Sequence, residues 1–212
     1  MIRNIFIAWR SKSGERRYII ARIKRTASGI SFEYMADFEK AKKGGLDFFF
    51  GFKDEKKLNS TEIYNLLSLR VISKDRPDRN EFLKFWEAEG VDDTFDLLGL
   101  TQGKSPTDNF EFLADFLTED TKKLTFVTDL AGLSHLQLKS GFVKKGDILS
   151  YKHEKNNEYD NKAIAVYKGE SKVGYIKKIH NKVFDMKRKL KLTVKAIDEN
   201  GVTKQIYIKV EK

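Results

Sequence analysis

The sequence predicts an α+β protein, in which an N-terminal antiparallel sheet with helices is followed by a small β-barrel with one helix. Three observations support this prediction. Short apolar runs of strand length open the chain, helix-start signals occupy its middle, and strand-like runs return in its last third. With 212 residues, 40% of them hydrophobic, the chain is long enough for one large domain or two small ones.

Strand-like runs predict an antiparallel meander at the start of the chain. Serine–glycine pairs, which favour turns, separate the runs at Ser13-Gly14 and Ser28-Gly29. The aromatic stretch LDFFFGF at 46–52 is too short to span a membrane and predicts core or a buried loop. The runs themselves cover residues 5–9, 18–23 and 30–35.

Helices are predicted in the middle of the chain. The first starts at Ser60 and Thr61, and the second begins at the capping residue Asp78 and ends near Gly90. The third is DDTFDLLGL at 92–100, whose acidic first turn complements the helix dipole.

A domain boundary is expected at LTEDTKK, residues 117–123, where apolar residues become scarce and charges alternate. We therefore predict domains at 1–119 and 120–212. The second domain is mostly β in character, with a basic amphipathic helix at 178–189 and a final hairpin closed by Asp-Glu-Asn-Gly. Several short strands with one helix predict a small closed or half-closed barrel. The strand-like runs cover 125–129, 148–153, 162–167, 172–176, 190–197 and 203–210.

Charge separates the two halves of the chain. Lys and Arg number 20 and Asp and Glu 21 in residues 1–120, against 21 and 10 in residues 121–212, which gives net charges of −1 and +11. Clustered cations attract phosphates and release their counterions on binding, so the second half is suited to a polyanion. The alternative interpretation is a surface that only keeps the protein soluble.

Composition also indicates the cellular setting. The chain has no cysteine, which excludes disulfides and thiolate metal sites and favours a reducing compartment. The first residues lack a small-residue cleavage pattern, and no eighteen apolar residues run together. We expect a soluble, cytoplasmic protein that does not bind a membrane.

Motifs for catalysis and metal binding are incomplete. GLTQGKS at 99–105 has three residues between its glycines, whereas a phosphate-binding loop needs four. HEKNN at 153–157 lacks the second histidine of a zinc-binding helix. His135, His153 and His180 are widely spaced, which favours surface or structural roles over a metal site. We expect no enzyme, no cofactor and no metal.

A polar loop precedes a predicted hairpin in residues 156–176, NNEYDNKAIAVYKGESKVGYI. Asparagine amides can hydrogen-bond base edges, the Tyr159 ring can stack on a base, and Asp160 can accept a hydrogen bond from a sugar hydroxyl. This combination suits the end of a nucleic-acid strand. The alternative is an Asx-rich turn, in which Asp160 caps backbone amides.

The second half resembles a HIRAN domain over about residues 124–210. The shared features are an AGL entry, a Gly-Asp before a strand, N-x-Y-D-x-x-A-I-x-V, and V-G-Y-I-x-K on the return strand. The resemblance implies a small OB-like or SH3-like β-barrel with one or two helices, which binds single-stranded DNA and reads free 3′ ends.

Site residues follow from this resemblance position by position. Tyr159 would stack on the terminal base, Asp160 would accept from the 3′-hydroxyl, and Asn157 would contact a base or sugar. Where a eukaryotic member of the family has Arg-Tyr-Tyr, this chain has Ser-His-Leu, so a guanidinium and a second ring are absent, although the histidine can stack or donate. The remaining positions expected in the same groove are Ser134, His135, Tyr175, Lys177 and Lys178.

The first half resembles the N-terminal subdomain of HipA-type toxin kinases and the HipA-N-like regions that precede HIRAN domains in bacterial proteins. The segments that carry this resemblance include GISFEYMADF, LDFFFGF and the R-P-D-R motif at 76–79. It implies protein contact or regulation and not phosphotransfer, because the kinase motifs are missing. At least two of Arg70, Arg76 and Arg79 are expected to form ion pairs within the chain.

The leading hypothesis is a bacterial or phage-related protein whose C-terminal domain binds single-stranded DNA or DNA ends, and whose N-terminal domain contacts a protein partner. The alternative is a regulatory, antitoxin-like interaction module that binds no specific nucleic acid. A third hypothesis, a nuclease, is based on Asp75, Asp78 and Glu81 close to Lys84.

Overall fold

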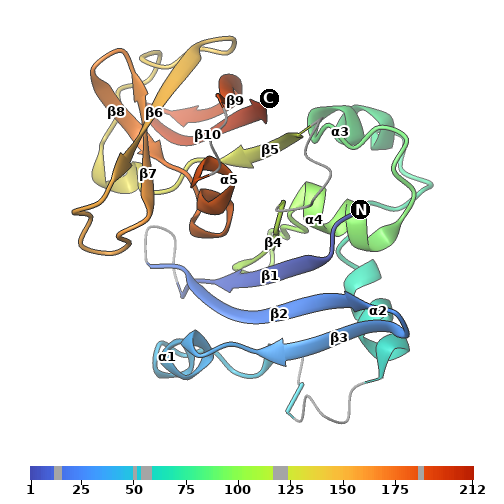
Figure 1. Cartoon of the computed structure of the whole chain (residues 1–212). Coiled ribbons are helices and arrows are strands. Elements are labelled where there is room, and N and C mark those ends of the chain that lie inside the picture. Colours follow the sequence, from blue (N-terminus) through green and yellow to red (C-terminus); the bar gives the residue numbers. More distant parts are fainter. Residues whose placement is uncertain (12–15, 50–51, 54–58, 117–123, 186–188) are drawn as a thin grey trace. The chain divides into compact units, whose positions relative to one another are not determined.

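The computed structural model describes residues 1–11, 16–49, 52–53, 59–116, 124–185 and 189–212 (Figure 1). The chain divides into two compact units, Met1–Thr118 and Glu119–Lys212, called here the N-terminal and C-terminal units. The predicted boundary segment at 117–123 and the predicted Ser13-Gly14 turn lie outside the described residues. Among the helices that the structure describes, none is long and apolar enough to cross a membrane.

The N-terminal unit contains a four-stranded antiparallel sheet in the order β3-β2-β1-β4. The predicted meander is confirmed by its first three strands. The fourth strand, which lies beside β1 and pairs Phe112 with Ile7, was not predicted, because the five residues FEFLA are too few to show a clear periodicity. The strands are β1 (Asn4–Trp9), β2 (Tyr18–Thr26), β3 (Gly29–Tyr34) and β4 (Phe110–Ala114).

Helices of the N-terminal unit follow the predicted starts. The first predicted helix begins at Ser60 as expected, and Asn59 caps it through a capping box with Glu62. Asp78 precedes its helix as predicted, but its side chain bonds to Arg76 instead of the backbone. The helices are α1 (Asp37–Lys43), which was not predicted, α2 (Ser60–Ser68), α3 (Arg79–Phe85) and α4 (Thr94–Thr101).

An aromatic cluster fills the core between the sheet and the 46–52 segment. Phe49 is fully buried and packs edge-on against Phe110, and Phe52 is buried against Phe32. The expectation of a core segment is confirmed for these two rings, while residues 50–51 lie outside the described part. Apolar burial of this kind supplies most of the stabilisation of such a unit.

The C-terminal unit contains a six-stranded antiparallel sheet in the order β5-β10-β9-β6-β7-β8. All six predicted strands are present. A closed barrel is not confirmed in the described part of the unit, where a single bridge from Ala131 to Tyr175 links the segment after β5 to β8. The strands are β5 (Thr125–Asp129), β6 (Ile148–Glu154), β7 (Ala163–Lys168), β8 (Ser171–Tyr175), β9 (Lys191–Asn200) and β10 (Val202–Glu211).

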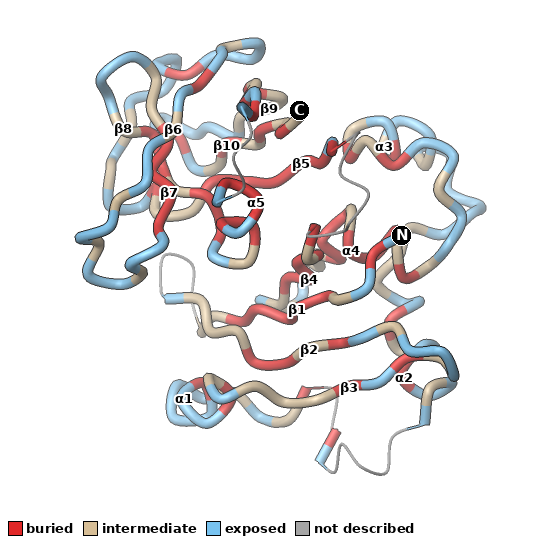
Figure 2. The backbone as a smooth tube through the Cα atoms, viewed as in Figure 1, coloured by how far each residue is buried: buried red, intermediate tan, exposed pale blue. Residues whose placement is uncertain are grey.

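Helical segments of the C-terminal unit are short. The predicted helix at 178–189 consists of a 3-10 turn, η5 (Lys178–His180), and one α-helical turn, α5 (Asn181–Asp185), while residues 186–188 lie outside the described part. Another 3-10 turn, η4 (Leu133–His135), follows β5. Figure 2 shows β5 and β7 as largely buried, in keeping with the fully buried Phe126 and Ile164.

Candidate nucleic-acid interface

The loop between β6 and β7 is organised by Asn157. Its Oδ1 accepts hydrogen bonds from the backbone N–H of Tyr159, at 3.0 Å, and of Asp160, at 3.1 Å. These are the bonds of an Asx turn, in which a side chain imitates a backbone turn. Consequently the loop has a defined shape, and its Tyr159 side chain is 71% exposed.

Asp160 anchors the other end of this loop. Its Oδ1 accepts from the backbone N–H of Lys162 at 3.0 Å, and its Oδ2 accepts from Asn181 Nδ2 of α5 at 2.8 Å. The Asx-rich turn is therefore present, and Asp160 holds the loop against α5. Each carboxylate oxygen has a second lone pair, so contact with a 3′-hydroxyl stays a prediction.

Glu154, at the end of β6, connects the loop to β8. Its Oε2 accepts from Asn157 Nδ2 and from the Tyr175 hydroxyl, both at 2.8 Å, and its Oε1 accepts from Lys172 Nζ at 2.6 Å. Lys172 also donates to the Tyr175 hydroxyl oxygen at 2.8 Å. We call these four residues the Glu154 cluster. It joins two predicted site residues, Asn157 and Tyr175, through two residues that were not predicted.

Electrostatics keep the Glu154 cluster charged at neutral pH. Hydrogen bonds from Lys172 first, and then from Asn157, lower the pKa of Glu154 to about 2. The bond with Glu154 is also the main cause that raises the pKa of Lys172. Burial is the main cause that raises the pKa of the Tyr175 phenol, which stays neutral. A carboxylate, an ammonium and a phenol therefore hold one another in place.

The AGL segment lies against the Tyr175 ring. Ala131 and Tyr175 exchange backbone hydrogen bonds of 2.8 and 2.9 Å. Gly132 has φ of +78°, and a Cβ atom there would lie 3.0 Å from the Tyr175 ring, so glycine suits both the conformation and the contact. The segment then enters η4, where Ser134 and His135 are exposed.

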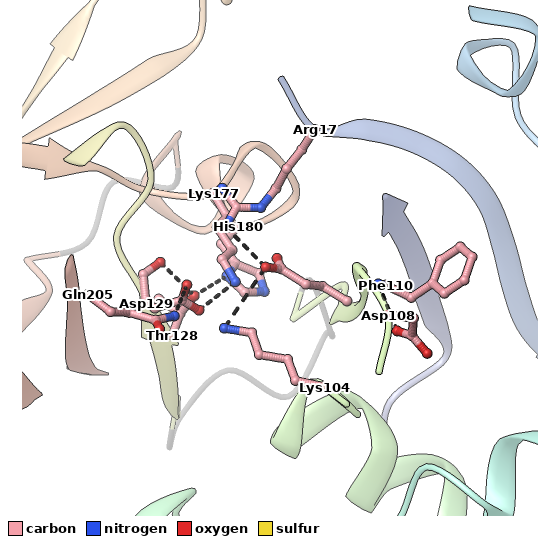
Figure 3. A network of polar contacts seen from close by, with 10 residues as sticks. Arg17, Lys104, Asp108, Phe110, Thr128, Asp129, Lys177, His180 and Gln205 are labelled. Atoms are coloured by element: carbon pink, nitrogen blue, oxygen red, sulfur yellow. Dashed lines mark hydrogen bonds and ion pairs between the residues drawn. The ribbon is translucent and has the colours of Figure 1, made fainter. Parts of the chain in front are cut away.

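Lys177 requires a correction. The resemblance placed it in a phosphate-binding groove, but its side chain is 1% exposed and its Nζ lies 2.5 Å from Asp129 Oδ1. Gln205 Nε2 donates to Asp129 Oδ2 at 2.8 Å, and the two donors converge on this carboxylate in Figure 3. A buried carboxylate needs a paired charge, and Lys177 supplies it. Its neighbour Lys178 is exposed, as the prediction requires.

Among the predicted residues, hydrogen bonds link Asn157 to Tyr159 and Asp160 directly and to Tyr175 through Glu154. Asp160 also contacts Asn181, three residues after Lys178, while Ser134, His135 and Lys178 are exposed and Lys177 is buried. Sequence reasoning missed Glu154, Lys172 and Asn181. Strand register brings Glu154 near Tyr175, because pairing of Glu154 with Ala163 and of Ala165 with Tyr175 puts their side chains on one face, and this register is known only once the strands are paired.

Other candidate groups have structural roles. His180 is buried, with Nδ1 3.1 Å from Thr128 Oγ1 and its ring against Phe126, as Figure 3 shows for the first contact. In the N-terminal unit, Arg70 pairs with Asp108 and Arg76 pairs with Asp78, which confirms two expected ion pairs. Asp78 is thereby engaged in a salt bridge, and the described residues contain no acidic or histidine group suited to a metal ion.

Comparison with known proteins supports the resemblance for the C-terminal unit. The family model of the HIRAN domain matches residues 123–197, which indicates a DNA-binding module in this stretch. The crystal structure of the HIRAN domain of human HLTF is similar at 22% identity and a TM-score of 0.33, over 41% of this chain and 74% of that chain.

A crystal structure of a protein from Lactobacillus plantarum is similar at 18% identity and a TM-score of 0.33, over 42% of this chain and 99% of that chain. No curated protein matches the chain. The family match does not extend into the N-terminal unit.

Proposed function

We propose that the C-terminal unit binds single-stranded DNA and recognises its 3′ end at the loop between β6 and β7. The observation that supports this most directly is Tyr159, a large ring that is 71% exposed on a loop held by side-chain hydrogen bonds. An ordered, exposed ring offers a stacking surface, and stacking on a base is tolerant of sequence. The HIRAN match over this loop supports the same function.

Charge supports the proposal as well. The residues from 121 onward carry a net charge of +11, and Lys155, Lys162 and Lys178 are exposed on or next to the loop and η5. Lysines near a stacking ring meet phosphates and release counterions, which makes binding sensitive to salt. Asp160 lies among these cations, where a carboxylate repels phosphate but accepts from a free hydroxyl. A strand end therefore fits this loop better than a continuous backbone does.

For the N-terminal unit we propose a protein-contact role without catalysis, in line with its resemblance to the HipA N-terminal subdomain. Leu69 is 80% exposed at the end of α2, and Tyr64 on the same helix is 43% exposed. These two side chains are the exposed large apolar positions of this element at which contact with a partner can be tested. The arginines of the R-P-D-R region do not contradict this role, since Arg76 is paired with Asp78.

The test is binding of labelled oligonucleotides measured by fluorescence anisotropy. We expect salt-sensitive binding of an oligonucleotide with a free 3′-hydroxyl, weaker binding of its 3′-phosphate analogue, and a loss of about 1–3 kcal/mol for Tyr159→Ala. Tyr64→Ala, an equally simple truncation of an exposed ring in the other unit, is the matched control and should bind as the wild type does.

Asp160 is tested by two variants that separate its proposed role from its anchoring role. Asp160→Asn should remove the preference for a free hydroxyl, whereas Asn181→Ala, which removes only the anchor to α5, should keep it. Equal binding of both oligonucleotides by the wild type would overturn end recognition. Absence of salt-sensitive binding would overturn DNA binding and favour the alternative, a protein-interaction module.

A further inference from the structure

One face of strands β6, β7 and β8, on which Lys152 is exposed and Ala165 is covered by its neighbours, continues from the loop that carries Tyr159. Register places Lys152 opposite Ala165, and Ala165 opposite Tyr175, so these side chains share one face. The other face of the same strands carries the buried Ile164, Val166 and Val173 and belongs to the core. The strands lie side by side in Figure 1. We call the first face the β6–β8 outer face.

Two lysine–tyrosine pairs occupy the β6–β8 outer face. Lys172 Nζ lies 4.9 Å from the centroid of the Tyr175 ring, and Lys152 Nζ lies 5.4 Å from the centroid of the Tyr167 ring. Each pair places a cation next to an aromatic ring. A nucleotide has the complementary features, because it carries an anionic phosphate beside an aromatic base.

The two pairs follow one another along β7. Tyr175 stands opposite Ala165 and Tyr167 is two residues further on, a step of about 7 Å along the strand. The loop with Tyr159 lies at the other end of β7, just before Ala163. In the direction of β7, the rings therefore follow the order Tyr159 in the loop, Tyr175 on the neighbouring strand β8, and Tyr167 on β7 itself.

The cations of the two pairs differ in how they are balanced. Lys172 is held by Glu154, so this pair is close to neutral and positions the Tyr175 ring. Lys152 is exposed, and no carboxylate of the described residues forms an ion pair with it. The Lys152 ammonium lies at the end of the outer face that is farther from Tyr159. A phosphate bound there would be attracted by an ammonium group that none of these carboxylates neutralises.

We propose that the β6–β8 outer face binds the body of a DNA single strand whose 3′ end lies at Tyr159, with Tyr167 and Lys152 as the distal contacts. This inference rests on the proposed function and extends it to the nucleotides that precede the end. Charge complementarity at Lys152 and continuity with the loop support a single strand as the occupant. Stacking on Tyr167 requires unpaired bases, which a duplex does not offer.

The dependence of binding on oligonucleotide length tests whether the single strand runs along the β6–β8 outer face, a path that we call the track. We compare an oligonucleotide of about three nucleotides with one of about twelve, both with free 3′ ends, because single-strand-binding OB folds span roughly 4–16 nucleotides. The wild type should bind the longer one more tightly. Tyr167→Ala and Lys152→Ala should each weaken the longer complex about tenfold and leave the shorter one unchanged, and Lys152→Ala should lower the salt slope by about 1.

Matched variants make the outcomes separable. Lys204→Ala removes an exposed lysine from β10, two strands away from β6–β8 in the sheet, and should change neither complex beyond a general charge effect. Tyr159→Ala should weaken both complexes. Lys152→Gln serves as a second variant on the exposed position, in case Tyr167→Ala lowers the urea midpoint.

Two results would overturn proposals, and they differ. If Tyr159→Ala weakens both complexes while the Tyr167 and Lys152 variants leave the longer one intact, the track is wrong and the end site stands. If the wild type binds neither oligonucleotide, the proposed function is wrong and the track falls with it.

Discussion

Two lysine–carboxylate groups of the C-terminal unit use the same chemistry in different surroundings. Asp129 and Lys177 have side chains that are each 1% exposed, and Gln205 completes what we call the Asp129 network. Glu154 and Lys172, the charged members of the Glu154 cluster, are 30% and 27% exposed. The ion pairs have nearly equal lengths, 2.5 and 2.6 Å.

The two groups differ in burial, so breaking their ion pairs has different energetic costs. Breaking a buried pair leaves an unpaired charge away from water, which is costly, whereas a half-exposed pair is screened by solvent and contributes little to stability. The Asp129 network joins β5, β10 and the residue before η5, so it supports the fold. The Glu154 cluster holds the loop that carries the exposed Tyr159 against the half-buried Tyr175. Similar side-chain geometry therefore supports the fold in one place and, under the proposed function, positions a DNA-binding loop in the other.

Removing Lys177 should give the largest loss of stability, and it tests directly whether the Asp129 network supports the fold. Lys177→Ala leaves the Asp129 carboxylate buried without its cation, so we expect a loss of about 3–5 kcal/mol in the free energy of unfolding. Urea denaturation measures it. A midpoint equal to that of the wild type would show that the pair does not support the fold.

A smaller loss of stability is expected when Gly132 of the AGL segment, which contacts the Tyr175 ring of the Glu154 cluster, is replaced. Gly132→Ala places a Cβ at φ of +78° and 3.0 Å from the Tyr175 ring, so we expect a loss of about 1–3 kcal/mol and weaker DNA binding. Gly141→Ala is the matched control, because φ is +76° there and no atom lies within 4 Å of the added Cβ. Equal losses in both variants would show that the ring contact contributes nothing.

Acid should weaken the Glu154 cluster by a modest amount. The pKa of Glu154 is about 2 in the folded protein, below its ordinary value of 4.5, so its stabilisation is present above about pH 4.5 and is lost as the pH falls toward 2. Because the pair is partly exposed, we expect about 1 kcal/mol. The measurement is the difference in unfolding free energy between the wild type and Glu154→Gln, which should shrink across this range. A difference independent of pH would contradict the assignment.

Replacing Lys178 should have the smallest effect on stability, in contrast to replacing its buried neighbour Lys177. Lys178→Ala removes an exposed side chain, so we expect a change within about 0.5 kcal/mol in the free energy of unfolding. If Lys178 contacts phosphate, the salt dependence of DNA binding should fall by a slope of about 1. An unchanged slope would remove Lys178 from the interface.

Local patterns predicted much of this architecture. Short strand-like apolar runs located β1, β2, β3 and all six strands of the C-terminal unit, because strands bury one face or, as in β1 and β7, both faces. The same patterns missed β4 and α1, which are short and show their partners only in three dimensions. A closed barrel requires the end strands β5 and β8 to pair with each other. The described residues show one isolated bridge, between Ala131 and Tyr175, at this place, so a closed barrel is not confirmed.

For the candidate site, the sequence by itself determined the polar loop, its exposed tyrosine and the basic character of the C-terminal unit, since these follow from residue types and their spacing. Only the tertiary structure decided which of two adjacent lysines is buried. Lys177 and Lys178 have the same side chain, and they differ because Asp129, from a distant strand, lies beside the first. Contacts between segments far apart in the chain also brought Glu154 to Tyr175, because strand register, which local composition does not encode, sets which side chains meet.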